Sequence, residues 1–251
     1  SYFFKLRAII NNYDIVHLHL PNPLAAFFVL FTNFRGKIVL HWHSDIIKQK
    51  FFKKIYAPFD YLIKQKANSI VVTSDNYLNN SDDLKGFKEK CSVIPIGIDP
   101  LELNVDKAFL EILKSRYVGK KIIFSLGRLI YYKGFEYLIE ATKNLSDDTL
   151  VLIGGIGPLE SKLKNLIKQN NLDHKVKLLG KIPFEYLGAY FQLANLFCLP
   201  STHKSEAFGV VLIEAMSFGL PQVIFNIPGS GVSFVVKADY SGKIINKIHE
   251  K

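Results

Sequence analysis

Short, near-continuous runs of apolar residues alternate with amphipathic segments along the whole sequence. The apolar runs are rich in Val, Ile and Leu, whereas the segments between them carry apolar residues at helical spacing. Such an alternation indicates parallel sheets covered by helices. In the first part of the chain, strands are expected at 14–20, 37–43, 69–74 and 91–99, with helices at 23–34 and about 50–67.

The second part repeats this pattern more clearly, after a stretch from 99 to 120 that holds one helix and a connection flanked by Pro and Gly. We therefore predict an α/β fold of two Rossmann-like domains, residues 1–105 and 106–251. The second domain is expected to have strands at 121–127, 149–155, 175–180, 195–200 and 221–226, and helices at 134–145, 158–172, about 185–194 and from 209 to about 218.

Length and composition fit two small globular domains and exclude several other classes. The 251 residues are 49% apolar and 22% charged, which is typical of a folded chain rather than a disordered or fibrous one. Two cysteines are too few for a disulfide framework and fit a reducing cytoplasm. The longest apolar run, 24–31, is far shorter than the roughly 20 residues of a membrane-spanning helix.

The formal net charge of +10 indicates an anionic partner. The charge is spread over both halves and no recognition motif is present, so nucleic acid is not expected. One local concentration, from Lys48 to Lys66, holds six lysines against a single Asp60, with aromatic residues between them. It is interpreted either as a basic amphipathic face for anionic lipid or as a solvated helix whose aromatic residues face the core.

The densest group of candidate site residues surrounds the expected start of the helix near 209. Glu206 and Glu214 flank this start, and Gly209 allows backbone to approach a ligand. Free N–H groups at a helix N-terminus bind oxygen anions, so the segment predicts a polyol or phosphate site. The alternative is that Glu206 caps the helix and Glu214 is a solvated surface residue.

A second group follows the strand at 121–127, where doubly wound sheets bind ligands. Arg128 offers a planar fork and Lys133 a point charge, which together suit a diphosphate; the alternative is two surface cations. The glycines at 154–157 end the next strand, but they lack the full G-x-G-x-x-G spacing, and a tight turn explains them equally well.

Taken together, these segments resemble the retaining GT-B glycosyltransferases of family 4, and their order and spacing match along most of the chain. The resemblance implies two Rossmann-like domains facing a cleft and transfer of a hexose from a nucleotide-diphosphate sugar to a hydroxyl acceptor, in bacterial surface polysaccharide or lipid-linked glycan synthesis. It is carried by E-x-F-G-x4-E-A at 206–215, G-x-P at 219–221, G-R-x4-K-G at 127–134, V-I-P-x-G-I-D at 93–99 and His43-Ser44-Asp45.

The same resemblance assigns roles to individual residues. Arg128 and Lys133 would hold the diphosphate and stabilise the leaving group, and Glu214 would bind the ribose hydroxyls. Glu206 would hold the hexose hydroxyls, and His43 would lie near the reacting sugar and the acceptor. The implied catalytic residues are His43, Arg128, Lys133 and Glu206, and the implied donor-binding residues are Gly127, Arg128, Lys133, Gly155, Glu206, Ala207, Phe208, Gly209 and Glu214.

No metal or other cofactor is expected. In this family Arg, Lys and helix N-termini replace a metal, and no Asp-x-Asp occurs in the chain. His17 and His19 alternate on one expected strand, as His41 and His43 do on another, so each pair shares a face. Zinc is one interpretation of these pairs, but histidines at strand ends beside a cleft explain them without a metal; Trp42 points to the opposite face and is expected in the core.

The sequence departs from the family at both ends. The family's first strand and glycine-rich acceptor loop are not found, and the chain stops soon after 241–245, before the expected C-terminal helices. We therefore expect an incomplete N-terminal domain, and the alternative function is a donor-binding module without turnover on its own. The expected location is cytoplasmic, with peripheral attachment to the inner face of the plasma membrane through 48–66.

Overall fold

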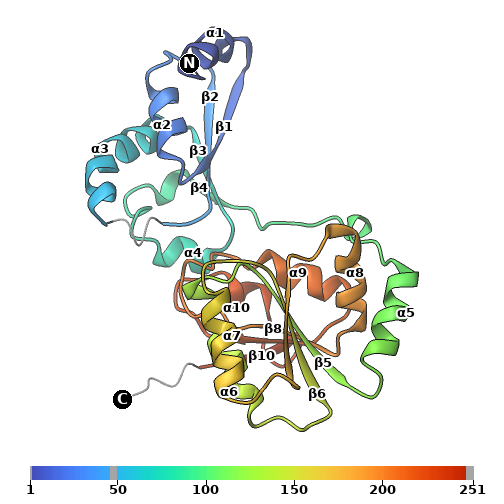
Figure 1. Cartoon of the computed structure of the whole chain (residues 1–251). Coiled ribbons are helices and arrows are strands. Elements are labelled where there is room, and N and C mark those ends of the chain that lie inside the picture. The colour runs from blue at the N-terminus through green and yellow to red at the C-terminus, as the bar shows by residue number, and fades with distance from the viewer. Residues whose placement is uncertain (1, 46–49, 247–251) are drawn as a thin grey trace. The chain divides into compact units, whose positions relative to one another are not determined.

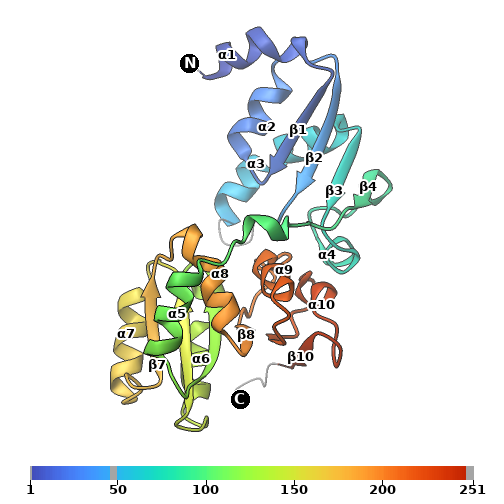
Figure 2. The ribbon, with the colours of Figure 1, turned by 90° about the vertical axis from the view of Figure 1, so that its right-hand side faces the viewer.

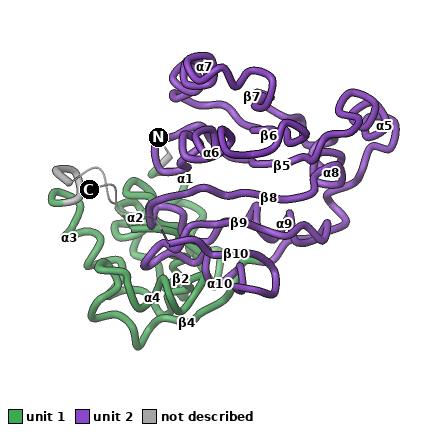
Figure 3. The backbone as a smooth tube through the Cα atoms, turned by 90° about the horizontal axis from the view of Figure 1, so that it is seen from below, with its two compact units in different colours: residues 1–96 green, residues 97–251 purple. Residues whose placement is uncertain are grey.

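The computed structural model describes residues 2–45 and 50–246 and contains two parallel sheets, each in its own compact unit. The units are residues 1–96 and 97–251 (Figure 3). The boundary lies nine residues before the expected one at 105/106, because the connection already packs on the second unit. Leu103 is buried. The backbone of Asn104 lies close to Gly188 of the second unit, since a Cβ added to Gly188 would be 2.3 Å from the Asn104 carbonyl oxygen.

The first unit has a four-stranded sheet in the order β1-β2-β3-β4, with all neighbouring strands parallel (Figure 1). The expected strand at 91–99 is much shorter, since its pairing with β3 ends at Val93. The elements are β1 (Ile15–Leu20), β2 (Lys37–Trp42), β3 (Ser69–Val72), β4 (Cys91–Val93), α1 (Tyr2–Ile9), α2 (Pro23–Leu30), α3 (Lys50–Lys66) and α4 (Asp75–Asn80).

The second unit has a six-stranded parallel sheet in the order β10-β9-β8-β5-β6-β7. Its strands are β5 (Lys121–Leu126), β6 (Thr149–Gly154), β7 (Val176–Gly180), β8 (Leu196–Leu199), β9 (Gln222–Phe225) and β10 (Gly242–Ile245). Its helices are α5 (Lys107–Arg116), α6 (Phe135–Thr142), α7 (Glu160–Gln169), α8 (Phe184–Leu193), α9 (Val210–Ser217) and α10 (Val232–Val235). The fold class expected from the sequence, two Rossmann-like parallel sheets, is confirmed.

Two cores, one on each face, bury this second sheet. Along β6, Leu150 and Leu152 join the core beneath α5, α8, α9 and α10, whereas Val151 and Ile153 join the core beneath α6 and α7. Helices α5 and α8 lie side by side in Figure 2. Because both faces of β6 are buried, its sequence is a continuous apolar run rather than an alternating one.

The strand order creates a topological switch point between β5 and β8. The chain runs outward from β5 to β6 and β7, then returns to the other side of β5 to form β8, β9 and β10. Open parallel sheets bind ligands at the carboxyl ends of the two strands that flank such a point. The loops that follow β5 and β8 are therefore the place in this unit to search for a site.

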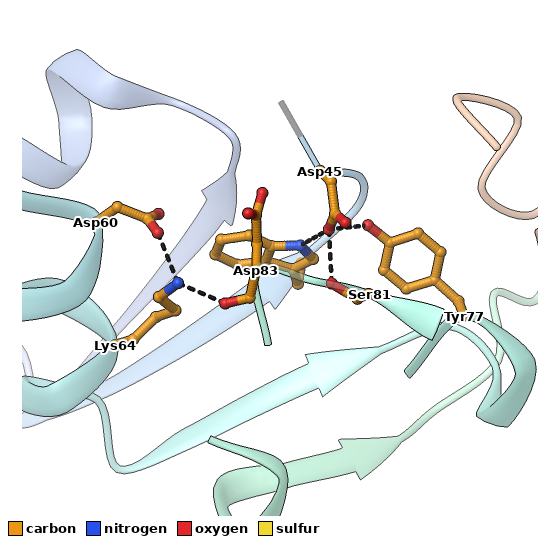
Figure 4. Close-up of polar contacts among 7 residues, drawn as sticks. Asp45, Asp60, Lys64, Tyr77, Ser81 and Asp83 are labelled. Carbon is orange, nitrogen blue, oxygen red and sulfur yellow. Dashed lines mark hydrogen bonds and ion pairs between the residues drawn. The ribbon is translucent and has the colours of Figure 1, made fainter. Parts of the chain in front are cut away.

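A buried carboxylate links two segments of the first unit. Oδ1 of Asp45, a residue 7% exposed, accepts hydrogen bonds from Trp42 Nε1 (3.1 Å), Tyr77 Oη (2.6 Å) and Ser81 Oγ (2.7 Å) (Figure 4). Burial, followed by the charge of Asp45, raises the pKa of Tyr77, so its hydroxyl stays a donor. Trp42 is in the core, as expected from the sequence.

Candidate functional site

Glycines allow the loops after β5 and β6 to touch. Gly155 has a φ of 130°, and a Cβ on it would lie 1.9 Å from the carbonyl oxygen of Gly127. The Gly127 N–H donates to the carbonyl oxygen of Gly154 at 3.0 Å. This contact supports the tight-turn interpretation of the glycines after β6, since any side chain at 155 would push the two loops apart.

The loop after β5 is also held against the loop after β8. Tyr131–Lys133 form one turn of 3-10 helix that ends at Gly134, whose φ is 63°. A Cβ on Gly134 would lie 2.1 Å from the carbonyl oxygen of Pro200. The N–H of Thr202 donates to the carbonyl oxygen of Tyr132 at 2.8 Å. These contacts place the side chain of Lys133 at the switch point.

Lys133 forms a buried ion pair there with Glu206. Lys133 Nζ lies 2.6 Å from Glu206 Oε2, and the two side chains are only 12% and 10% exposed. Ser201 Oγ donates to the same carboxylate oxygen at 2.8 Å. The carboxylate thus faces Lys133, which disfavours the interpretation of Glu206 as a helix cap.

The backbone that follows Glu206 is fixed by two further contacts. Ser230 Oγ donates to the carbonyl oxygen of Glu206, and the N–H of Gly231 donates to the carbonyl oxygen of Ala207 at 2.7 Å. Phe208 is buried, and Gly209, with a φ of 78°, directly precedes α9. Helix α9 therefore begins four residues after Glu206, and N–H groups at a helix N-terminus can bind oxygen anions.

The other two charged residues of the predicted donor set, Arg128 and Glu214, make no described contact with the ion pair. Glu214 is half-buried in the second turn of α9, and burial raises its pKa. Arg128 follows Gly127 and is exposed. Burial, followed by the charge of Glu206, raises the pKa of Tyr132, and the positive charge of Arg128 opposes this rise.

Sequence reasoning missed two residues of this site, Ser201 and Ser230. Both are fully buried hydroxyls, one bonded to the carboxylate of Glu206 and the other to its backbone. Serine is common in loops and follows no periodic pattern, so the available signal for Ser201 was its position in the loop that follows β8.

The predicted residue of the first unit, His43, belongs to a cluster of four histidines. His19 lies opposite His41 in the register of β1 and β2, and all four imidazoles stack with centroid separations between 4.2 and 5.6 Å. His19 Nδ1 lies 2.7 Å from His43 Nε2. Burial and neighbouring imidazoles lower the pKa of His43 and that of His41, the latter to about 4.

The lysine-rich segment 48–66 falls partly outside the described side chains, which omit 46–53. Lys54 and Lys66 are exposed on α3. Lys64 is instead buried, with Nζ 2.6 Å from Asp60 Oδ2 and 2.6 Å from the carbonyl oxygen of Asp83 (Figure 4). Counting Lys64 as part of a basic surface was therefore wrong. Among the described helices, none has the length and apolar character needed to span a membrane.

Comparison with protein families gives matches over both units. The family described as Glycosyltransferase Family 4 matches residues 1–101, and the family described as Glycosyl transferases group 1 matches residues 111–247. The second match covers more than half of the chain. It contains every residue of the candidate donor site in the second unit.

Two curated relatives match nearly the whole chain. O-antigen chain mannosyltransferase C of Escherichia coli is 32% identical over 96% of this chain and 64% of its own length. D-rhamnosyltransferase WbpZ of Pseudomonas aeruginosa is 31% identical over 94% of this chain and 61% of its own length. The chain thus spans less than two thirds of the length of these relatives.

Solved structures share the fold at lower identity. Anabaena Alr3699/HepE in complex with UDP superimposes with a TM-score of 0.81 at 20% identity, over 97% of this chain and 68% of that one. Sucrose-phosphate synthase of Thermosynechococcus elongatus gives 0.78 at 22% identity, over 97% and 63%. With the family match over residues 111–247, these results show that the chain belongs to the glycosyl transferases group 1 family and has its two-sheet GT-B fold.

Proposed function

We propose that the second unit binds a nucleotide-diphosphate sugar at the Lys133–Glu206 pair, and that the whole protein transfers the hexose to a hydroxyl acceptor in surface polysaccharide synthesis. The observation that carries the proposal is this buried pair at the switch point of the sheet. Two relatives support it by their names, as an O-antigen mannosyltransferase and a rhamnosyltransferase, and a structural neighbour binds UDP-glucose.

Each part of such a donor has a chemical counterpart in the site. Lys133 and Arg128 carry two positive charges, and the carboxylate of Glu206 neutralises one of them. One net positive charge is left to balance a diphosphate. The N-terminus of α9 adds oriented N–H groups for phosphate oxygens. Glu206 then accepts hydrogen bonds from hexose hydroxyls, and Glu214 from ribose hydroxyls.

The proposed transfer retains the anomeric configuration. The family does not supply a carboxylate nucleophile on the reacting face, so the acceptor attacks from the face that the nucleotide leaves, and the departing phosphate oxygen takes the acceptor proton. Lys133 and Arg128 stabilise the charge that develops on this phosphate. A product with inverted configuration would overturn the mechanism.

Donor binding is tested by calorimetric titration of UDP, GDP and ADP into the chain. We expect micromolar binding of one nucleotide, unchanged by EDTA because side-chain cations and helix N–H groups supply the positive charge. Glu214→Ala is expected to weaken it by about tenfold or more, the effect of losing hydrogen bonds to a charged group. Glu185→Ala, an exposed glutamate on α8, is the matched control. Loss of binding in EDTA, or equal effects of both variants, would contradict the proposal.

The second candidate function is donor binding without turnover. It is favoured by the position of the proposed donor-binding residues, which all belong to the second unit. Donor hydrolysis and transfer assays separate the two, because a binding module retains nucleotide affinity with no release of free hexose and no transfer to added acceptor.

The acceptor side of the proposal is contact with an anionic membrane through an apolar surface on α2 and α3. These two helices pack together, and Phe27 of α2 touches Phe59 of α3 at 5.3 Å between ring centroids. The α2–α3 surface has basic side chains beside it, since Lys54 and Lys66 are exposed on α3. Its exposed apolar members are Leu24, Phe27, Phe31, Ile55 and Leu62, which are 39% to 61% exposed.

Vesicle sedimentation tests this contact. The chain is expected to bind phosphatidylcholine vesicles that contain phosphatidylglycerol, and to be released by salt, since each lysine near such a surface contributes about 1 kcal/mol. Leu24→Ser and Ile55→Ser should each weaken binding, whereas Leu101→Ser, at a residue 80% exposed in the second unit, should not. Equal binding to vesicles without phosphatidylglycerol, or no binding at low salt, would exclude the contact.

A further inference from the structure

Three histidines of the first unit have ring nitrogens that lie close together. His17 and His19 on β1 and His41 on β2 each offer one ring nitrogen, and these nitrogens all lie within 4.8 Å of one another. The three side chains share one face of the sheet because the two strands are parallel and His19 is paired with His41 in register. The opposite face holds core residues such as Leu18 and Leu40.

A second observation points into the same cluster. His41 Nε2 is buried and has no hydrogen-bond partner among the described residues. Buried ring nitrogens in native proteins are normally bonded, and one without a protein partner calls for a water molecule or an ion. Its ring stacks on those of His17 and His19, so the ring that carries this nitrogen belongs to the cluster.

His43 is placed to hold the ring of His19 in position. Its Nε2 lies 2.7 Å from His19 Nδ1. In the tautomer in which His19 donates Nδ1–H to His43, the lone pair of His19 Nε2 is free for a metal. Ligating histidines typically bond their other ring nitrogen in this way, which fixes both ring orientation and tautomer.

We propose that His17, His19 and His41 bind one first-row transition metal ion, with Zn²⁺ as the reference ion, and that His43 orients His19 from outside the coordination shell. Neutral imidazoles are preferred ligands of such ions, and three of them leave a fourth position open for water or substrate oxygen. The geometry therefore favours the zinc interpretation that the sequence alone left second. The proposed metal site lies in the first unit and is separate from the donor site, whose residues all belong to the second unit.

Ring rotation is enough to complete the site. A tetrahedral zinc ion bound at about 2.0–2.1 Å needs ligand nitrogens about 3.3 Å apart, against the 4.8 Å limit found here. His17 is exposed, so its ring can turn without repacking the core, while His19 keeps the orientation given by His43. Because both strands contribute ligands, the ion would cross-link β1 to β2.

The test is Zn²⁺ binding by the untagged chain after chelator treatment, measured in competition with a chromophoric chelator. We expect one equivalent to bind, and Zn²⁺ to raise the melting temperature by stabilising the folded state alone. His17→Gln and His41→Gln should each weaken affinity by about tenfold or more. His174→Gln, at an exposed histidine of the second unit, is the matched control and should have no effect.

The outcomes separate clearly. Absence of stoichiometric Zn²⁺ binding by the wild-type chain, or equal losses in His17→Gln and His174→Gln, would overturn the proposal. If His41→Gln fails to fold, as judged by circular dichroism, the exposed His17 decides alone. Nucleotide affinity is measured in parallel and should be the same with and without Zn²⁺, so failure of the donor proposal would leave this one intact.

Discussion

Replacing Lys133 by alanine is expected to weaken nucleotide binding at least a hundredfold and to destabilise the second unit. The variant removes the most buried cation of the proposed diphosphate site, a side chain 12% exposed. It also leaves the carboxylate of Glu206 buried with Ser201 as its remaining partner. Breaking a buried pair by removing one member typically costs about 3 to 5 kcal/mol. Calorimetry measures the first effect and urea unfolding the second.

Two further variants separate binding from stability. In Lys133→Ala combined with Glu206→Gln, the uncompensated charge is gone, so most of the lost stability should return while nucleotide binding stays weak. Lys162→Ala, at an exposed lysine of α7, should change neither quantity. Wild-type nucleotide affinity in Lys133→Ala would refute the proposed site.

In the first unit, Asp45→Ala is expected to lower the free energy of unfolding by about 3 to 5 kcal/mol. The variant removes the oxygen that accepts hydrogen bonds from Trp42, Tyr77 and Ser81, all of which are buried. Each buried donor left without an acceptor costs about 1 to 3 kcal/mol. Because Trp42 is the one tryptophan of the chain, its fluorescence reports unfolding of this unit directly.

Asp45→Asn is the matched comparison, since it keeps an acceptor oxygen at the same place and should cost clearly less than alanine. Nucleotide affinity should survive both substitutions, because the proposed donor site lies in the second unit. A tryptophan unfolding curve for Asp45→Ala that coincides with the wild-type curve would contradict the assigned role.

The sequence predicted the strands of the second unit well because burial on both faces makes them continuous apolar runs, as in β6. It overextended the strand at 91–99, whose pairing with β3 ends at Val93, and it did not identify α4, α10 or β10, which are too short to show periodicity. The expected domain boundary lies nine residues after the division between the two units, because the approach of the Asn104 backbone to Gly188 is a long-range contact that no local pattern records.

The sequence indicated individual candidate residues but not the contacts between them. Lys133 and Glu206 were both expected near the donor, but nothing in their spacing indicates that they pair with each other. The histidine pairs were correctly assigned to shared faces, whereas the proximity of the two pairs depends on β1 and β2 being neighbours in register. Sequence periodicity gives the direction of a side chain within its own strand, and only the assembled sheet gives its neighbours.

The pairing of Lys133 with Glu206 also bears on ligand selectivity. The Glu206 carboxylate occupies the position at Lys133 Nζ that a phosphate oxygen would take. An incoming anion therefore has to compete with Glu206 for the ammonium group of Lys133. An inorganic phosphate that displaced the carboxylate from Lys133 would leave the Glu206 carboxylate without its cation in a site largely shielded from water. If the second unit binds the proposed donor, a ligand that joins a phosphate to a sugar would give Glu206 hydroxyl donors in exchange, and the pair would favour sugar-bearing nucleotides over simple anions.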